Sequence, residues 1–421
     1  MTVEFISLIN VWESSELHPR PGGAPDAAYI RRYARSLEDG GFDYTLVAYH
    51  SSGYDPFTVS ATIAACTDRI KPIVALRPNT MQPTVAAQSL ATLDQLSGGR
   101  AVVHIISGGS DAEQARQGDY VPKDDRYARS EEYVRILRRA WQETQPWDHD
   151  GRFYRFENFV AGFRPVNGTI PVSIGGSSDE AYRVGGALGD IFGLWGEPLA
   201  ETREQMDRVA AQARLAGRTD VPRTWVTFRP IVAETDELAW EKAHATMGVV
   251  DQTHKSGGFL RSARRDGPPQ NVGSQRLLEI AARGEVHDRA LWMLPAQITG
   301  AMGASTALVG SYETVAAAIL DYVDLGADLV SIRGYDNLND AIDYGRYVLP
   351  LVRSELAHRA STGQRQQAQP GQPAQPAQQA QAGQQAQAGQ PTQPGQPAQV
   401  GELARPAQTG QPAEAAAGRA S

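Results

Sequence analysis

Short apolar runs alternate with longer amphipathic segments along the chain as far as about residue 350. The apolar runs are almost continuous, which is typical of parallel strands that are covered on both faces. We expect eight strands, at residues 3–10, 44–49, 71–76, 101–107, 170–174, 190–195, 224–233 and 328–333. The amphipathic segments predict helices at residues 27–39, 56–66, 83–96, 127–143, 180–188, 198–215, 312–325 and 338–349.

This alternation predicts the fold class α/β, as a (β/α)8 TIM barrel with insertions that occupies residues 1–360 as one domain. Gly98 and Gly326 stand where helices give way to strands, and glycine there accepts the left-handed conformation that ends a helix. The competing α/β fold is a doubly wound dinucleotide-binding domain. It requires a Gly-x-Gly-x-x-Gly turn after its first strand, and the sequence has none there.

Two connections are too long to be plain turns. Residues 145–167 are rich in aromatic residues and glycine and predict a hairpin-like excursion before the fifth strand. Residues 247–305 separate the seventh strand from the helix that closes the barrel unit. Long insertions in barrels are usually surface elements or cover the site, so we expect a mobile lid here.

The last segment, residues 361–421, is built from Gln, Pro, Ala and Gly, with no aromatic residue. Such a composition offers too little apolar surface to offset the entropy of ordering a backbone. We predict a disordered tail. A polyproline-like interaction segment is the functional alternative.

Composition narrows the classes of partner and cofactor. The net charge of −8 argues against a nucleic-acid partner or an anionic membrane. The single cysteine, Cys66, excludes an internal disulfide framework and a CxxC metal site, and its small apolar neighbours predict a buried helical thiol. P-loop, HExxH and GxSxG patterns are absent, and we expect no metal site. Without a signal peptide or an apolar run of membrane-spanning length, we expect a cytoplasmic location and no membrane partner.

Residues whose side chains can take part in binding or catalysis cluster at the ends of the predicted strands, and these ends meet at one mouth of a barrel. His50 ends the second strand, His104 lies on the fourth, and Tyr335 follows the eighth beside Arg333. After the fifth strand comes Gly175-Gly176-Ser177-Ser178-Asp179. Glycines admit a ligand to the backbone, and hydroxyls with helix-start N–H groups receive phosphate oxygens. An ordinary helix N-cap explains Ser-Ser-Asp equally well, so both interpretations stay open.

Several motifs occur together in the order that a known family has them. They are Val74-Ala75-Leu76-Arg77-Pro78, Ala91-Thr92-Leu93-Asp94-Gln95-Leu96-Ser97-Gly98-Gly99-Arg100, Asp125-Arg126-Tyr127, Gly175-Gly176-Ser177-Ser178 and Thr306-Ala307-Leu308-Val309-Gly310. With them, the chain resembles the bacterial-luciferase-like flavin monooxygenases over about residues 3–352. The most similar branch is that of the alkanesulfonate and dimethylsulfone monooxygenases.

The resemblance implies a reduced FMN that a separate NAD(P)H-dependent flavin reductase supplies and that reacts with O2. By the motifs, the expected cofactor-binding residues are His50, His104, Glu113, Tyr127, Ser177 and Ser178. The histidines would flank the isoalloxazine and Tyr127 would reach the phosphate or ribitol. The serines would hold the phosphate, and Glu113 matches a flavin-contacting carboxylate in a relative that opens pyrimidine rings. The resemblance also implies a homo-oligomer, a dimer or tetramer.

The sequence departs from the alkanesulfonate pattern at positions that bear on the substrate. Gly53 stands where those enzymes have a cysteine, and Thr227-Phe228-Arg229 replaces their Arg-x-His. Their arginine before the Thr-Ala-Leu-Val-Gly motif is missing too. Arg229 remains near the lost pair, and Tyr335 matches their tyrosine after the eighth strand. His50, Arg229 and Tyr335 are therefore the expected catalytic residues, with fewer arginines for a sulfonate than the branch has.

From these observations we predict a monooxygenase that uses reduced FMN and O2 on a small organosulfur compound, such as an alkanesulfonate that it desulfonates. A deazaflavin-dependent dehydrogenase on the same barrel is the competing enzyme, since it passes hydride and needs no oxygen. A non-catalytic flavin-binding protein is the third possibility. Turnover would separate this third class from both enzymes.

Overall fold

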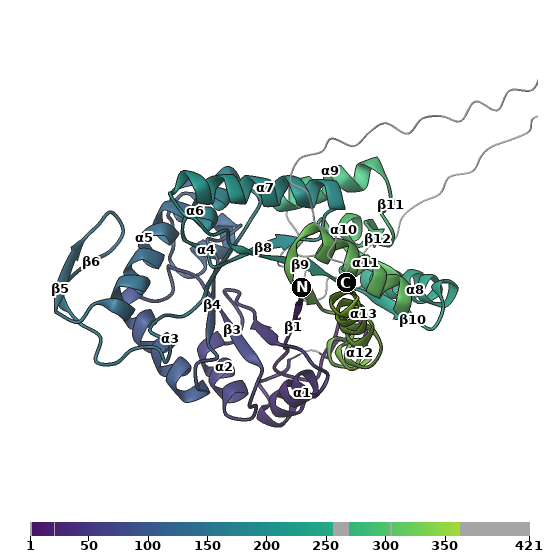
Figure 1. Cartoon of the computed structure of the whole chain (residues 1–421), viewed down its shortest axis with the longest axis horizontal. Helices are drawn as coiled ribbons and strands as arrows, with labels where there is room; N and C mark the ends of the chain where they lie inside the picture. The colour runs from purple at the N-terminus through teal and green to yellow at the C-terminus, as the bar shows by residue number, and fades with distance from the viewer. Residues whose placement is uncertain (1, 21, 256–268, 304, 363–421) are drawn as a thin grey trace, which may run out of the picture. The chain divides into compact units, whose positions relative to one another are not determined.

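A computed structural model describes residues 2–20, 22–255, 269–303 and 305–362. Eight parallel strands in these residues form a closed barrel, in the order β1-β14-β9-β8-β7-β4-β3-β2 (Figure 1). The strands are β1 (Glu4–Leu8), β2 (Tyr44–Val47), β3 (Lys71–Leu76), β4 (Val102–Ile105), β7 (Val172–Gly175), β8 (Ile191–Trp195), β9 (Arg223–Phe228) and β14 (Ala327–Ile332). The predicted (β/α)8 barrel is confirmed.

Helices follow the strands around the outside of the barrel. They are α1 (Ala27–Asp39), α2 (Pro56–Ala64), α3 (Pro83–Ser97), α5 (Lys123–Gln142), α6 (Asp179–Leu188), α7 (Leu199–Leu215) and α11 (Tyr312–Leu325). Gly98 and Gly326 cap α3 and α11 with φ of 68° and 115°, the left-handed conformation that the sequence predicts. Cys66 lies just past the end of α2 and is half-buried, so the expectation of a buried helical thiol is wrong.

The part of the barrel interior away from the carboxyl ends of the strands is filled by one inward side chain from each of seven strands. Ile6, Tyr44, Ile73, Val102, Ile191, Trp225 and Leu329 form this layer. Because side chains alternate along a strand, the neighbours of these residues point outward and pack against the surrounding helices. The packed layer restricts open space inside the barrel to the carboxyl ends of the strands.

The seventh apolar run, residues 224–233, is not one strand. It divides into β9 and β10 (Ile231–Ala233), and β10 belongs to a second sheet with β13 (Ala307–Ser311), β12 (Leu291–Trp292) and β11 (Val286–His287). Pro230 separates the two strands, and proline cannot donate to a strand ladder. The chain therefore leaves the barrel at Arg229.

Both long connections form regular structure. Residues 145–167 contain the antiparallel hairpin of β5 (Trp147–Asp150) and β6 (Arg155–Phe159), as predicted, and Figure 1 shows it projecting beside α3 and α5. In the second connection, α8 (Asp236–Lys255) is followed by α9 (Val272–Arg283), β11, β12 and α10 (Leu294–Thr299). Residues 256–268 and 304 of the expected lid lie outside the described residues. The described remainder is built mainly of helices, with β12 paired to β13 and β11 paired to β12.

The last predicted helix is longer than residues 338–349. It consists of α12 (Asn337–Asp343), a π-helical turn (Tyr344–Val348) and α13 (Leu349–Ser361). Pro350 lies in the first turn of α13, where its missing N–H interrupts the helical ladder least. Residues 363–421, almost all of the expected tail, lie outside the described residues. None of the described helices has the length and apolar character that a bilayer crossing requires.

Candidate active site

A cavity of about 400 Å³ opens at the carboxyl ends of the barrel strands. Its walls come from β1, β2, β4, β7, β8, β9 and β14, together with the loop before α9. Ligand cavities in barrels lie at this face because the βα loops vary while the strands below stay fixed. Among the described residues that line it, Lys123 and Arg333 are the cations, and none is Asp or Glu.

One end of the cavity is a cradle of glycines and hydroxyls between β7 and α6. Gly175, Gly176, Ser177, Ser178 and Tyr127 line it. Gly176 has φ of 137°, and a Cβ there would lie 2.4 Å from the Tyr127 hydroxyl oxygen, so the turn excludes any larger residue. The N–H groups at the start of α6 and two serine hydroxyls therefore gather at one point of the wall, as an anion-binding helix start requires.

Ser178 is also the N-cap of α6, since its Oγ accepts from Ala181 N at 3.3 Å. A serine hydroxyl has one donor proton besides its lone pairs. Capping therefore uses a lone pair of Ser178 and not its proton, so the two interpretations of Ser-Ser-Asp are compatible. Burial raises the pKa of Tyr127, with the neighbouring Ser178 hydroxyl opposing the shift, so Tyr127 is neutral. Its hydroxyl donates to Gly175 O at 3.4 Å.

His104 and Trp225 form the middle of the cavity. Their ring centroids are 5.2 Å apart, and His104 Nδ1 lies 2.9 Å from Ser173 Oγ. Burial lowers the pKa of His104 to about 4, so its imidazole is neutral at physiological pH. Trp225 is 4% exposed, and its indole nitrogen has no acceptor among the described residues. This part of the wall is aromatic and uncharged.

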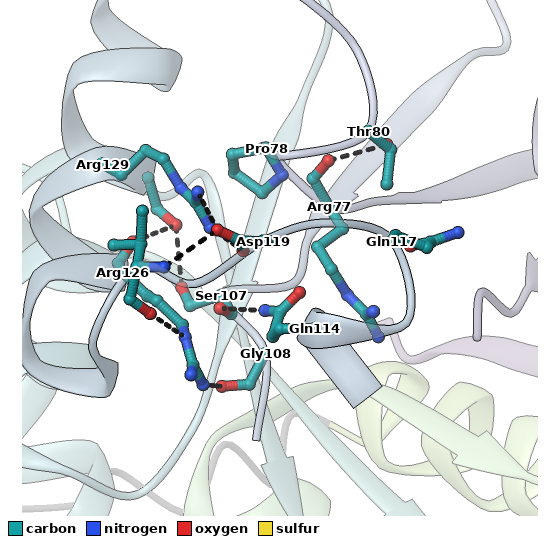
Figure 2. A network of polar contacts seen from close by, with 12 residues as sticks. Arg77, Pro78, Thr80, Ser107, Gly108, Gln114, Gln117, Asp119, Arg126 and Arg129 are labelled. Atoms are coloured by element: carbon teal, nitrogen blue, oxygen red, sulfur yellow. Dashed lines mark hydrogen bonds and ion pairs between the residues drawn. The ribbon is translucent and has the colours of Figure 1, made fainter. Parts of the chain in front are cut away.

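Arginines of α5 hold the loop between β4 and α5 by the polar contacts in Figure 2. Residues 106–109 of this loop line the cavity. Arg126 donates to Gly108 O at 3.2 Å, and Arg129 makes a bidentate pair with Asp119 at 2.8 and 2.7 Å. Both partners of that pair are less than a tenth exposed. Gln114 Nε2 donates to Ser107 O at 3.2 Å from inside the loop. The backbone at Ser107 and Gly108, which lines the cavity, is thus held from behind.

The wall of the cavity at β14 carries charged side chains. Arg333, at the end of β14, lines the cavity. Behind it, Arg229 is 3% exposed and donates to Glu16 Oε1 at 2.6 Å, to Glu16 Oε2 at 3.2 Å and to Gly334 O at 3.0 Å. The guanidinium carbon of Arg229 lies 3.7 Å from the centroid of the Tyr335 ring. Burial acts to lower the pKa of Arg229, but the Glu16 charge outweighs it and the pKa is raised.

Arg229 and Tyr335 therefore lie together, but neither is among the residues that line the cavity. Arg229 forms a buried ion pair with Glu16, an arrangement that the sequence did not exclude. Tyr335 is buried with a hydroxyl that has no partner among the described residues, and burial raises its pKa to about 12. Tyr335 is consequently protonated at neutral pH.

His50 and Glu113 lie together at the rim, also outside the cavity lining. Glu113 Oε1 accepts from Ser51 N at 3.0 Å and from Arg77 Nη2 at 2.9 Å. Burial lowers the pKa of His50, against the opposing charge of Glu113. Burial would raise the pKa of Glu113, but its bonds to Arg77 and Ser51 outweigh this and lower it. Of the predicted residues, the structure thus brings His104, Tyr127, Ser177 and Ser178 into one cavity.

Several residues that line or support the cavity were not singled out from the sequence. Lys123 and Trp225 gave no motif, and Glu16 lies in a loop without any pattern. Asn271, Val272 and Gly273, at the start of α9, also line the cavity. The segment is anchored because Arg276 of α9 pairs with Glu197, which is 1% exposed, at 2.7–3.2 Å. For Arg333, its position at the end of a predicted strand was a signal that could have singled it out from the sequence.

Residues 5–329 match the model of a protein family described as luciferase-like monooxygenase. Among solved structures, a riboflavin lyase with modified FMN and riboflavin has a TM-score of 0.70 and 21% identity, over 84% of this chain and 92% of that one. The EDTA monooxygenase of Chelativorans sp. BNC1 has a TM-score of 0.70 and 19% identity, over 84% and 94%. DmoA from Hyphomicrobium sulfonivorans has a TM-score of 0.67 and 19% identity, over 85% and 88%. Coenzyme F420-dependent enzymes also share the fold.

Proposed function

The chain belongs to the luciferase-like monooxygenase family, and on that premise we propose that it uses reduced FMN and O2 to oxidise a small organosulfur compound, such as an alkanesulfonate. The observation that carries the proposal is the cavity itself. One end offers hydroxyl and N–H donors at a helix start, and the middle offers aromatic walls. A ligand that joins a phosphate to a flat ring system requires this arrangement, with donors at one end of the cavity and aromatic walls beside them.

The residues fit FMN at the phosphate end. Ser177, Ser178 and the start of α6 would hold the phosphate, and Tyr127 would donate beside it. Lys123, four positions before Tyr127 on α5, also lines the cavity and adds a positive charge, and its Nζ donates to Gln270 O at 2.6 Å. The glycine at 176, whose Cβ would fill the cradle, supports the same assignment.

The ring system would lie against His104 and Trp225. Since His104 is neutral, it would contribute a hydrogen bond and a flat surface rather than a charge. Reduced FMN supplies the electrons that activate O2, and such chemistry requires a site from which bulk water is kept away. Trp195 and Val272 lie among the lining residues and would exclude water above the ring.

The remaining predicted residues have supporting positions in this proposal. His50 and Glu113 would shape the entrance, since the Arg77 and Ser51 bonds of Glu113 tie the loops after β2, β3 and β4 together. Tyr335 remains the candidate proton donor or acceptor, through a hydroxyl that has no partner in the described part of the chain. Arg229, tied to Glu16, would position the wall that carries Arg333.

The test combines the full-length chain with FMN, NADH, O2 and an NAD(P)H-dependent flavin reductase, which the proposal takes to be a separate protein. Alkanesulfonates of increasing chain length are screened for sulfite release and substrate-dependent oxygen consumption. Substrate-dependent oxygen use is expected. Oxidation of an alcohol with coenzyme F420 and no oxygen use with any FMN assay would favour the dehydrogenase, and flavin binding without either turnover would favour a non-catalytic protein. Size-exclusion chromatography with light scattering tests the expected dimer or tetramer.

A further inference from the structure

The wall of the cavity across from the phosphate cradle is aliphatic. In the closed strand order, β1 is four strands from β7, which leads into the cradle, by either route around the barrel. The lining residue of β1 is Leu8, and Leu46 and Ala48 line the cavity from β2 and the residue just after it. We call these three residues the aliphatic strip. A phosphate held at the cradle leaves the strip to another part of the ligands.

The strip is continuous along two neighbouring strands. Leu8 and Leu46 are direct partners in the pairing of β1 with β2, and Ala48 follows two positions later on the same face. One step toward the amino ends of the strands, Ile6 and Tyr44 belong to the packed layer and are less than a tenth exposed. Leu46 packs against that layer. The strip therefore begins where the filled part of the barrel ends, supported on one side and open to the cavity on the other.

The strip presents hydrocarbon to the cavity. Its three side chains contain no polar atom, and the carbonyl groups of both leucines have partners within the protein. Leu46 O accepts from Ile9 N at 3.2 Å, and Leu8 O accepts from the Tyr33 hydroxyl at 2.9 Å. All three strip residues are only half-buried. Because apolar surface in a cavity is stabilised when another apolar group covers it, the strip favours an apolar ligand group.

The outer end of the strip has the smallest side chain. Ala48 lies nearer the carboxyl end of its strand than Leu46, and Leu8 is level with Leu46. A chain that runs along the leucines toward the opening therefore passes Ala48 last. A larger side chain at this position would occupy the space of the last methylenes, since it projects to the same face.

We propose that Leu8, Leu46 and Ala48 determine substrate specificity by binding an unbranched alkyl chain of the substrate, with residue 48 limiting the length of that chain. The reaction itself rests on the proposed function. The substrate class is then a small aliphatic compound whose oxidised end lies at the ring system near His104 and whose chain points to β1 and β2. A charged group against the strip would lose its water without gaining a partner there.

Equilibrium binding tests the proposal without turnover. The FMN-loaded full-length chain is titrated by calorimetry with 1-butanesulfonate and 1-octanesulfonate, and with 1-butanol and 1-octanol. The two series differ in the charge of the head and share the chain, so an advantage common to both belongs to the chain. In each series the octyl compound should bind wild-type protein at least about tenfold more tightly than the butyl compound, because each methylene removed from water adds to binding.

Ala48→Leu should reduce this octyl advantage at least about fivefold in both series and change butyl binding less than about twofold, since the larger side chain displaces only the last methylenes. Ala48→Val should give a smaller reduction, and Ala48→Ser, which adds little volume, should keep most of the advantage. The matched control is Ala61→Leu, the same substitution at an exposed position of α2. It should leave the octyl advantage unchanged.

The proposal is overturned if wild-type protein binds both chain lengths equally, or if Ala48→Leu and Ala48→Val keep the full octyl advantage. It is also overturned if these variants weaken FMN and riboflavin instead, because the strip would then hold the cofactor. None of these results depends on oxygen consumption. An octyl advantage without any oxidation would sink the proposed reaction and leave the strip standing, whereas oxidation with equal affinity for both chain lengths would do the reverse.

Discussion

The two sides of the cavity handle charge differently. The cradle after β7 has hydroxyls, helix-start N–H groups and a neutral histidine nearby, whereas on the β14 side Arg333 lines the cavity and Arg229 pairs with Glu16. Residues 175–178 build most of the cradle, and the charged wall joins Glu16, Arg229 and Arg333 from three distant segments. The proposed phosphate site is thus formed by one short local turn, whereas the buried Arg229 needs the charge of Glu16 from a distant segment.

The largest effect is expected from breaking the charged wall. Arg229→Met leaves Glu16 without its partner and should lower the free energy of unfolding by about 2–3 kcal/mol. This is less than the about 3–5 kcal/mol typical of a fully buried pair, because the Glu16 side chain is 32% exposed. Oxidation of an anionic substrate should fall on the order of a hundredfold as Arg333 loses its support, and hydrogen peroxide release should rise.

Thermal unfolding, FMN titration and peroxide yield, measured on one preparation of Arg229→Met, test these expectations. The control is Arg20→Met, which breaks an ion pair with Glu13 that is more than half exposed on both sides. It should change stability by less than about 0.5 kcal/mol. If Arg229→Met loses FMN affinity but produces no additional peroxide, the two sides of the cavity are not separate in function.

The second effect concerns the cradle. The double substitution Ser177→Ala and Ser178→Ala should weaken FMN at least about tenfold, since charge-assisted bonds to the phosphate are lost. Riboflavin, without the phosphate, should bind almost as before. Fluorescence titration measures both ligands. Ser178→Thr, which keeps the hydroxyl and the helix cap, is the control, and equal weakening of FMN and riboflavin by the double variant would reduce the serines to capping residues.

A smaller effect is expected on the pH dependence of stability, because the cradle side of the cavity contains the neutral His104. The pKa of His104 is about 4 in the folded chain against an ordinary 6.5, so between these values the unfolded state binds the proton and the folded state does not. Stability from this group is complete above pH 6.5 and declines as the pH falls toward 4. His104→Gln should flatten part of the decline in melting temperature between pH 7.5 and 4.5. Identical slopes for both proteins would contradict the assignment of a buried neutral imidazole.

The smallest effect is expected from the tail. Truncation after Thr362 leaves α13 whole and removes a segment without an aromatic residue. Both sides of the cavity should be unaffected, with FMN affinity, turnover and melting temperature all close to those of the full chain. A shift of several degrees, or a large loss of turnover, would show that the tail contacts the barrel.

The sequence alone was enough to find the barrel, and it marked the turn at residues 175–178 as a candidate site. Continuous apolar runs identify buried parallel strands, and the eight-fold alternation with helices leaves few other arrangements. The turn at residues 175–178 could be singled out because its glycines, its hydroxyls and the helix that starts at the next residue are all local features of the sequence. Pro230 was a usable signal as well, and the seventh run could have been divided there.

The tertiary structure alone decided which charged side chains face the cavity. Arg229 and Glu16 are 213 positions apart, and no local pattern can express a pairing at that separation. Closure of the barrel places Arg333 on the wall and Arg229 behind it, although both stand at strand ends and look equivalent in the sequence. The same holds for α9, whose approach to the cavity depends on the buried pair of Arg276 with Glu197. Local chemistry follows from the order of residues, but the side on which a charge lies follows from packing and desolvation across the whole barrel.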